Sequence, residues 1–377
     1  MVAPQPPVVA PVEESGHPAS VTHGCCGDRA AMLGCHWTDP IGPRVRRRTE
    51  ARRIGPIPCP RVTRRLLGIL FVVACVFGAA AAAVVSTGAG AGRRSAPVAA
   101  PTDPARLCAA GAGTTVRVSV DVDGRARTAL VHVPHRRRGQ LPVVMALHGY
   151  GANGAFMERY SGLSRVADRE GFAVVYPDAD GPRWRISAAE APTDVRFLDA
   201  LLDRLDASGC LDDDRVSAVG VSNGGGMAAR FACAGEDRLA GLVSVAGGYS
   251  SLPRCEATRP ISVLEIHGTA DPVVPYGGRP GDGAGDVMRW LYDWIRRDAC
   301  PSAARRRTDR PGVQRLDWAP CRAGTSVAHL RLLGGLHAWP GAVPADAGPS
   351  FGVSAAEEAW DFLRGHRRAS AVEADTH

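Results

Sequence analysis

The amino-acid sequence predicts an α/β fold in which helices cover both faces of a mostly parallel sheet. Strand-like and helix-like segments alternate from about residue 107 to residue 363, and such alternation is typical of parallel strands joined by helices. Residues 143–147 form a short, continuous apolar run, as a strand buried on both faces does. Ahead of the alternation, two strand-like segments flank Asp123 and Gly124, which are a hairpin turn signal.

The expected strands are apolar, β-branched runs bounded by turn residues. The first two form the opening hairpin, and the later ones are separated by stretches long enough to hold a helix. In chain order they are 116–122, 128–133, 143–147, 173–176, 216–221, 242–246, 262–266 and 327–333.

The expected helices lie between these strands, and one more closes the domain. Asp286 is expected to cap one of them at its N-terminus. In chain order the helices are 160–169, 195–205, 225–234, 287–297 and 355–363.

Composition divides the chain into five expected segments. These are a disordered cytoplasmic tail at 1–65, an apolar segment at 66–85, a flexible Gly/Ala/Ser-rich linker at 86–105, the folded domain at 106–366 and a polar tail at 367–377. Alternatively, translation starts at Val62, and the tail is an artefact of gene annotation.

The apolar segment 66–85 is long enough to span about 30 Å of hydrocarbon. An arginine excess precedes it, which predicts a cytoplasmic N-terminus and a folded domain outside the cytoplasm. Three export readings remain open: a cleaved signal peptide, an uncleaved membrane anchor, and a lipoprotein signal in which Cys75 carries the lipid. A buried core helix is the non-export alternative.

The formal net charge of +7 lies mainly outside the folded domain. Residues 1–65 carry +5 and the remainder only +2. Nucleic-acid binding therefore has no electrostatic support in the main domain.

The strongest chemical signal is Gly220-Val221-Ser222-Asn223-Gly224, between an expected strand and an expected helix. A serine at such a position lies on a tight, strained turn, where flanking side chains would clash and glycine avoids the clash. The helix that follows presents unpaired N–H groups beside the hydroxyl. Ser222 is therefore the expected nucleophile.

A serine nucleophile needs a base, and the base needs an acid to orient it. With this motif the order along the chain is serine, acid, histidine. His337 is the expected base because it lies in a glycine-rich loop after the last strand, and Asp271 is the expected acid because it follows the preceding parallel strand. His267 is expected to orient the loop of Asp271, and His329 to be structural.

Acyl transfer also requires N–H donors for the oxyanion. Asn223, next to the nucleophile, is expected to supply one backbone donor. Tyr150, in the glycine-rich loop after strand 143–147, is expected to supply the second. Neither a metal ion nor a cofactor is expected.

Five motifs resemble the exported polyhydroxybutyrate-depolymerase and feruloyl/acetylxylan-esterase group of α/β-hydrolases, and most closely its actinobacterial lipoprotein esterases. They are HGYGANG, YPDADGPRW, GVSNGGGMA, HGTADPVVPYGG and GGLHAWPG, and they span most of residues 106–365. The resemblance implies an α/β-hydrolase fold, a catalytic triad of Ser222, Asp271 and His337, and an oxyanion hole from Tyr150 and Asn223. It also implies hydrolysis of a carboxylic ester: a hydroxyalkanoate, feruloyl or acetyl ester.

Three aromatic residues are candidates for substrate binding because they lie in loops near these motifs. They are Trp184, Tyr249 and Trp339, and core packing is the alternative for each. Trp339 is the best candidate because it is two residues from His337.

Six cysteines of the folded domain favour an oxidising compartment and three disulfides. Sequence proximity favours the pairs Cys233 with Cys255 and Cys300 with Cys321, which leaves Cys108 for Cys210. Free buried thiols are the alternative. The run Asp212-Asp213-Asp214 is interpreted as a charged turn rather than a calcium site.

These observations together predict an extracytoplasmic or envelope-anchored serine esterase. Its expected partners are a small or oligomeric ester substrate and the membrane, the latter through the N-terminal segment or a lipid. Two alternatives remain: a peptidase or thioesterase of the same fold, and a non-catalytic envelope binding protein on a hydrolase scaffold.

Overall fold

The computed structural model describes residues 107, 113–136, 139–234, 237–256, 259–279, 285–346, 348–349 and 351–368. All of them belong to one compact unit, Gly92–His377. The expected cytoplasmic tail, the apolar segment with Cys75, the linker and residues 369–377 lie outside the described residues. Within the described part of the chain, no helix is both long enough and apolar enough to cross a membrane.

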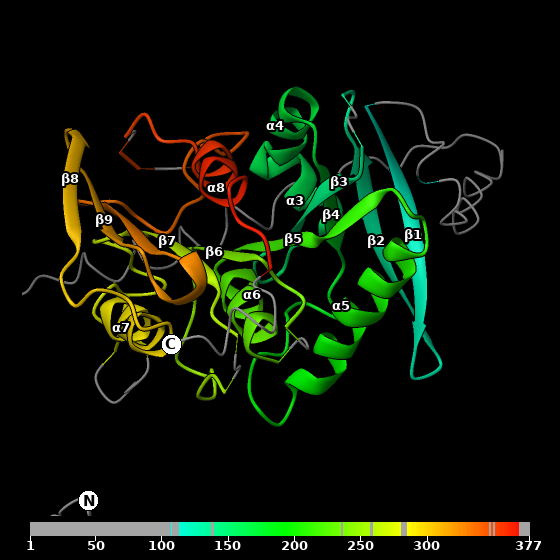
Figure 1. Ribbon diagram of the computed structural model, residues 1–377, viewed down its shortest axis with the longest axis horizontal. Coiled ribbons are helices and arrows are strands. Elements are labelled where there is room, and N and C mark those ends of the chain that lie inside the picture. Colours follow the sequence, from blue (N-terminus) through cyan, green and yellow to red (C-terminus); the bar gives the residue numbers. More distant parts are fainter. Residues whose placement is uncertain are drawn as a thin grey trace, which may run out of the picture. The chain divides into compact units, whose positions relative to one another are not determined.

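The centre of the molecule is a ten-stranded sheet with the order β1-β2-β4-β3-β5-β6-β7-β10-β9-β8 (Figure 1). Six neighbouring strands, from β4 to β10 in this order, run parallel, while both edges are antiparallel. The strands are β1 (Thr114–Val122), β2 (Arg125–Val133), β3 (Leu141–Leu147), β4 (Ala173–Pro177), β5 (Leu211–Val221), β6 (Gly241–Val245), β7 (Ser262–Gly268), β8 (Arg305–Arg310), β9 (Val313–Trp318) and β10 (Val327–Leu332).

Helices cover both faces of this sheet, which confirms the predicted fold class (Figure 1). One face carries α5 (Ala191–Asp206), α6 (Asn223–Ala234) and α7 (Val287–Arg297), and the other carries α3 (Gly154–Ser161), α4 (Leu163–Glu170) and α8 (Ala355–Leu363). Side chains of β3 alternate between the two cores: Met145 packs with the first group of helices and Val144 with the second. Because both faces of β3 are buried in this way, its sequence is continuously apolar.

Two elements differ from the sequence-based expectation. The single helix expected at 160–169 is two helices, α3 and α4, because Gly162 adopts a left-handed conformation with φ of 73° between them. The hairpin of β8 and β9 was not expected at all. It forms the sheet edge and is rich in arginine, so it lacks the apolar run by which buried strands are recognised.

Two of the three expected disulfides, Cys233–Cys255 and Cys300–Cys321, are confirmed. Cys210 is also disulfide-bonded, while its expected partner Cys108 lies outside the described residues. The confirmed bridges join residues 22 and 21 positions apart, and loops of this size are stabilised by about 3 kcal/mol in the chain-entropy model.

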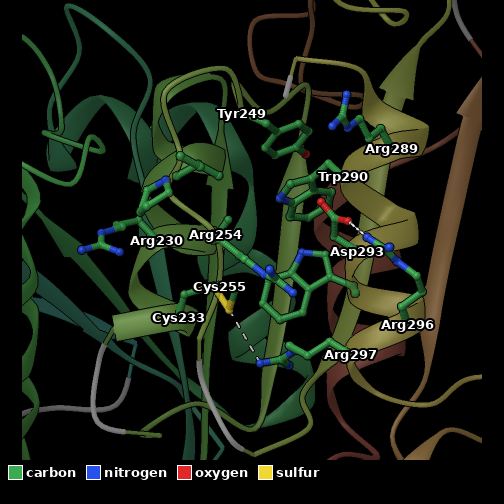
Figure 2. Close-up of a pocket in the computed structure, with 14 residues that line it drawn as sticks. Arg230, Cys233, Tyr249, Arg254, Cys255, Arg289, Trp290, Asp293, Arg296 and Arg297 are labelled. Carbon is green, nitrogen blue, oxygen red and sulfur yellow. Dashed lines mark hydrogen bonds and ion pairs between the residues drawn. A yellow bond between two sulfur atoms is a disulfide. The ribbon is translucent and has the colours of Figure 1, made fainter. Parts of the chain in front are cut away.

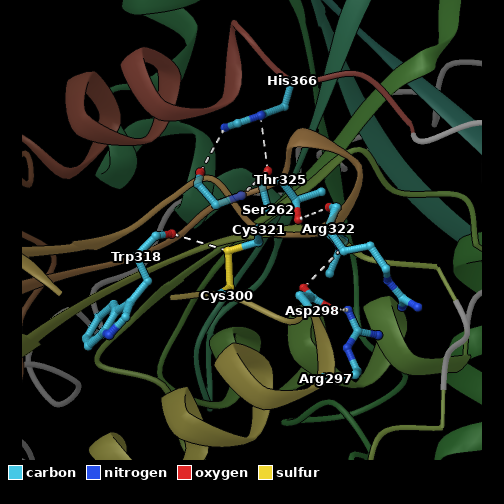
Figure 3. The surroundings of a disulfide bond; sticks show 11 residues. Ser262, Arg297, Asp298, Cys300, Trp318, Cys321, Arg322, Thr325 and His366 are labelled. Atoms are coloured by element: carbon cyan, nitrogen blue, oxygen red, sulfur yellow. Dashed lines mark hydrogen bonds and ion pairs between the residues drawn. A yellow bond between two sulfur atoms is a disulfide. The ribbon is translucent and has the colours of Figure 1, made fainter. Parts of the chain in front are cut away.

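The surroundings of Cys300–Cys321 show what this bridge holds together (Figure 3). Asp298, at the end of α7, accepts a hydrogen bond from the backbone N–H of Ile261 at 3.2 Å, and its carbonyl accepts one from Arg322 at 2.8 Å. Burial raises the pKa of Asp298 to about 6. The bridge thus joins the end of α7 to the segment before β10, and Asp298 links the end of α7 to the residue before β7.

The aspartate run 212–214 lies at the start of β5, with its carboxylates within 4.8 Å of one another. Arg367 is 3.3 Å from Asp212 and Arg368 is 2.9 Å from Asp214. These arginines pair with the run, which is charged as expected but lies in the first residues of β5 rather than in a turn before the strand.

Candidate active site

Ser222 occupies a sharp turn between the end of β5 and the start of α6. Its φ is 56°, in the left-handed region that non-glycine residues rarely adopt. Its backbone N–H donates to Val245 at 2.9 Å, and its carbonyl accepts hydrogen bonds from Gly226 and Gly248 at 3.1 Å each. The surrounding backbone thus holds Ser222 in this conformation.

The two flanking glycines of the motif have no room for a side chain. A Cβ on Gly220 would lie 2.1 Å from the carbonyl oxygen of Gly224, and one on Gly224 would lie 2.2 Å from that of Leu147. This steric requirement agrees with the argument made from the sequence. It also shows that Gly224 brings the turn against the end of β3.

Trp184, His148 and the side-chain amide of Asn223 fix the loop after β3 beside this turn. The side chain of Asn223 accepts a hydrogen bond from Trp184 N–H at 2.7 Å and donates to the Trp184 carbonyl at 3.1 Å. The Trp184 indole donates to the His148 carbonyl at 3.0 Å, and His148 Nε2 accepts from the Ala179 N–H at 3.1 Å. Asn223 is the first residue of α6, so its own N–H has no earlier helical carbonyl to bond.

His337 and Asp271 form a direct pair. His337 Nδ1 lies 2.8 Å from Asp271 Oδ2, and the other oxygen of Asp271 accepts backbone hydrogen bonds from Val273 and Val274 at 2.8 Å each. Burial by itself would raise the pKa of Asp271, but hydrogen bonds from His267 and His337 outweigh it and hold that pKa well below its usual range. Asp271 is therefore an anion that orients His337 through Nδ1.

Close contact between two glycines brings the loops of Asp271 and His337 together. A Cβ on Gly268 would lie 2.2 Å from the carbonyl oxygen of Gly335. The backbones bond directly at this place: Thr269 N–H donates to Leu332 and Ala270 N–H donates to Gly335, both at 2.9 Å. This role of Gly268 was not predicted, although a glycine directly after His267 at a strand end is a possible signal of it.

A buried ionic cluster lies behind Asp271. His267 Nδ1 is 2.7 Å from Glu265 Oε1, and its Nε2 is 3.3 Å from Asp271 Oδ2 and 3.0 Å from the Val274 carbonyl. Burial lowers the pKa of His267, but the charge of Glu265 more than compensates and raises it to about 10. His267 is thus a buried imidazolium between two carboxylates, and it holds the Asp271 loop as the sequence predicts.

His329 contacts the same cluster from β10. Its Nδ1 lies 2.8 Å from Glu265 Oε2, and its Nε2 lies 2.8 Å from the Tyr276 hydroxyl. It is fully buried, which agrees with the structural role expected for it. Glu265 was not predicted as part of the site, because an acidic residue within an apolar strand has no motif of its own.

Ser222 and His337 line one open cleft of about 640 Å³, together with the glycine-rich loop at Tyr150. Its aromatic wall comes from α3, where Phe156 and Tyr160 stack with ring centroids 4.9 Å apart. The Tyr160 hydroxyl donates to Asp346, which also borders the cleft.

The expected aromatic binding residues do not form this wall. Trp184 and Trp339 have no exposed surface, and Tyr249 is 1% exposed. Each ring has a packing role instead: the Trp339 indole donates to the Ser161 carbonyl at 3.0 Å, and Tyr249 stacks on Trp290 at 4.1 Å. Core packing, the alternative stated from the sequence, accounts for these contacts, because closeness to a motif in sequence does not determine which way a large apolar ring packs.

Comparisons with known proteins identify the family of this chain. Residues 127–276 match the family model described as Esterase PHB depolymerase. "Putative esterase NocK" of Nocardia uniformis subsp. tsuyamanensis is 34% identical over 351 residues, which cover 76% of this chain and 97% of that protein. Feruloyl esterase B of Piromyces equi is 25% identical over 217 residues, which cover 52% of this chain and 39% of that protein.

A solved structure shows the same fold. The acetyl xylan esterase from Aspergillus awamori aligns with a TM-score of 0.51 at 13% identity, covering 67% of this chain and 99% of that one. The chain thus belongs to the Esterase PHB depolymerase family and is an esterase with the α/β-hydrolase fold.

Proposed function

We propose that the chain is a serine esterase that hydrolyses carboxylic esters through a triad of Ser222, His337 and Asp271. One observation carries the proposal: Ser222, on a strained turn, borders the same cleft as a histidine whose Nδ1 is bound by a buried aspartate. A buried carboxylate on Nδ1 leaves Nε2 as the basic nitrogen, which is the arrangement a serine nucleophile needs.

In the first half of the proposed reaction, Ser222 Oγ attacks the ester carbonyl carbon and its proton passes to His337 Nε2. The carbonyl oxygen becomes an oxyanion, which accepts hydrogen bonds from the backbone N–H groups of Asn223 and Tyr150. The intermediate then expels the alcohol, which takes the proton from Nε2, and an acyl-enzyme on Ser222 remains. In the second half, His337 removes a proton from water, which attacks the acyl carbon and releases the acid.

The aromatic wall of the cleft favours esters with an aromatic acyl group. Phe156 and Tyr160 stack beside Ser222, and an aryl ring can extend such a stack. A feruloyl-type ester fits this wall better than an acetyl ester, which has no ring to place there.

An extracytoplasmic site of action is part of the proposal. The two disulfides of the described chain, and the disulfide-bonded Cys210, are typical of proteins from oxidising compartments. The apolar segment 66–85 would provide export or anchoring.

Active-site labelling tests the proposed nucleophile. A fluorophosphonate probe is expected to modify the folded protein at one position, and peptide mass spectrometry should find the adduct on Ser222. The exposed Ser302 provides a matched control: a Ser302→Ala variant should label like the wild type. A label on any other residue, or no label on an enzyme that hydrolyses p-nitrophenyl esters, contradicts the proposal.

Phe156→Ala is expected to reduce the preference for aromatic acyl groups. An aromatic pair is worth about 0.5–1.5 kcal/mol beyond burial, so kcat/KM for methyl ferulate should fall about 2- to 13-fold relative to that for methyl acetate. Tyr292→Ala removes an exposed ring from α7, outside the cleft, and should leave the ratio unchanged. An unchanged ratio in Phe156→Ala would show that the acyl ring does not lie on this wall.

A further inference from the structure

A second cavity, of about 610 Å³, lies between the end of α6, the loop with Cys255, and α7 (Figure 2). No residue lines both this cavity and the cleft of Ser222. Its base includes the buried rings of Trp290 and Trp294, and the disulfide Cys233–Cys255 holds one wall. We call this cavity the arginine pocket, for the five arginines that line it: Arg230, Arg254, Arg289, Arg296 and Arg297.

The charge of the arginine pocket is not balanced by its own residues. Asp293 is the one acidic residue that lines it, and it pairs with Arg296 (Figure 2). Arg297 pairs with Asp298 at 2.8 Å. Arg230, Arg254 and Arg289 have no ion pair with any described residue, although the domain as a whole is nearly neutral.

The three unpaired arginines come from separate elements, and the side chains of Arg254 and Arg289 are exposed. Arg230 lies on α6, Arg254 on the disulfide-bonded loop, and Arg289 on α7. The Nε of Arg230 is buried and makes no hydrogen bond to a described residue. A buried, unpaired guanidinium N–H costs free energy unless a ligand accepts its hydrogen bond, so the pocket is suited to an anion.

A third hollow, of about 300 Å³, is bordered by Val273 and Tyr249. Val273 also borders the cleft of Ser222, and Tyr249 also borders the arginine pocket. A ligand that reached from one to the other would be an extended molecule.

We propose that the arginine pocket binds the carboxylate groups of an acidic oligosaccharide chain that carries the ester cleaved at Ser222. Guanidinium groups bind carboxylates through paired, charge-assisted hydrogen bonds. Three unpaired arginines on three elements match several carboxylates along a chain better than one compact anion. The proposal rests on the proposed esterase function, because that function supplies the ester at the far end of the chain.

Calorimetric titration of the full chain with oligogalacturonate of six residues tests this site. The variant Arg230→Gln/Arg254→Gln/Arg289→Gln is expected to bind about 30-fold more weakly than the wild type, since each arginine contributes a charge-assisted contact. The control Arg165→Gln/Arg305→Gln/Arg306→Gln removes the same charge from exposed arginines outside the pocket and should bind within twofold of the wild type. Neutral maltohexaose should not bind.

Equal weakening in the two triple variants would overturn the proposal, because binding would then depend on net charge alone. Binding of inorganic phosphate as tight as that of oligogalacturonate would also overturn it, in favour of a compact anion site. Hydrolysis of p-nitrophenyl acetate by the wild type is measured in parallel. Hydrolysis without oligogalacturonate binding refutes only the arginine pocket as a substrate site, whereas binding without hydrolysis refutes the proposed esterase function.

Discussion

Asp271→Asn is expected to lower kcat for ester hydrolysis about 10⁴-fold while leaving the fold intact. Asparagine keeps the size of the side chain, but its amide can present an N–H group to His337 Nδ1 where the carboxylate now accepts at 2.8 Å. His337 would then carry its proton on Nε2 and could not act as base toward Ser222. The measurement is kcat for p-nitrophenyl butyrate at pH 7.5, with circular dichroism and thermal unfolding as checks of the fold.

Asp286→Asn is the matched control for this substitution. Asp286 is the nearby carboxylate that caps α7 by accepting from the Arg289 N–H at 2.8 Å, and asparagine caps helices equally well. Its kcat should stay within about twofold of the wild-type value, because an equally good cap leaves α7 unchanged. A loss of less than tenfold in Asp271→Asn would show that Asp271 is not the acid of the triad.

The local chemistry of the candidate site could be predicted from the sequence because steric constraints determine it within a few residues. The turn at Ser222 needs glycine at both 220 and 224, since a Cβ at either position would collide with backbone. This requirement produces a short pattern of glycines around a serine, which can be recognised in the sequence alone. The continuous apolar runs of the parallel strands are equally readable, because burial on both faces removes polar residues from them.

Features that depend on packing between distant segments could not be predicted in this way. Phe156 lines the cleft while Trp184 is fully buried, yet both lie in or beside the motifs singled out from the sequence and nothing local distinguishes them. The contact of Gly268 with Gly335 joins segments 67 positions apart. The β8–β9 hairpin is recognised only by its pairing with β10, since its charged sequence lacks an apolar strand signal.

His267→Gln is expected to lower the free energy of unfolding by about 3–5 kcal/mol near pH 7, because it leaves Glu265 as a buried charge without its cation. Glu265 and His267 have no exposed side-chain surface and lie 2.7 Å apart. The measurement is urea unfolding of both proteins between pH 6 and pH 10. The matched variant is Glu265→Gln/His267→Gln, which removes both charges and should recover most of the lost stability.

The pKa of His267 also determines how the stability contributed by this pair changes with pH. The pKa of His267 is about 10 in the folded chain and about 6.5 in an unfolded one. Between pH 6.5 and pH 10 the folded state therefore keeps a proton on His267 that the unfolded state releases. The contribution of this pair to the free energy of unfolding is thus fully present below pH 6.5 and declines as the pH rises toward 10. The stability difference between the wild type and His267→Gln should shrink over the same range. A difference that is constant from pH 6 to pH 10 would show that His267 is not a buried imidazolium.

The activity of His267→Gln separates a positioning role from a catalytic one. Asp271 keeps three other hydrogen bonds without His267: those from Val273, Val274 and His337. The orientation of His337 should thus survive, and kcat should fall by about tenfold or less, against about 10⁴-fold for Asp271→Asn. Because the Asp271 anion would lose one neighbouring cation, its pKa should rise toward its usual range. If His267→Gln instead reduced kcat as strongly as Asp271→Asn, the two residues would act as one unit in catalysis.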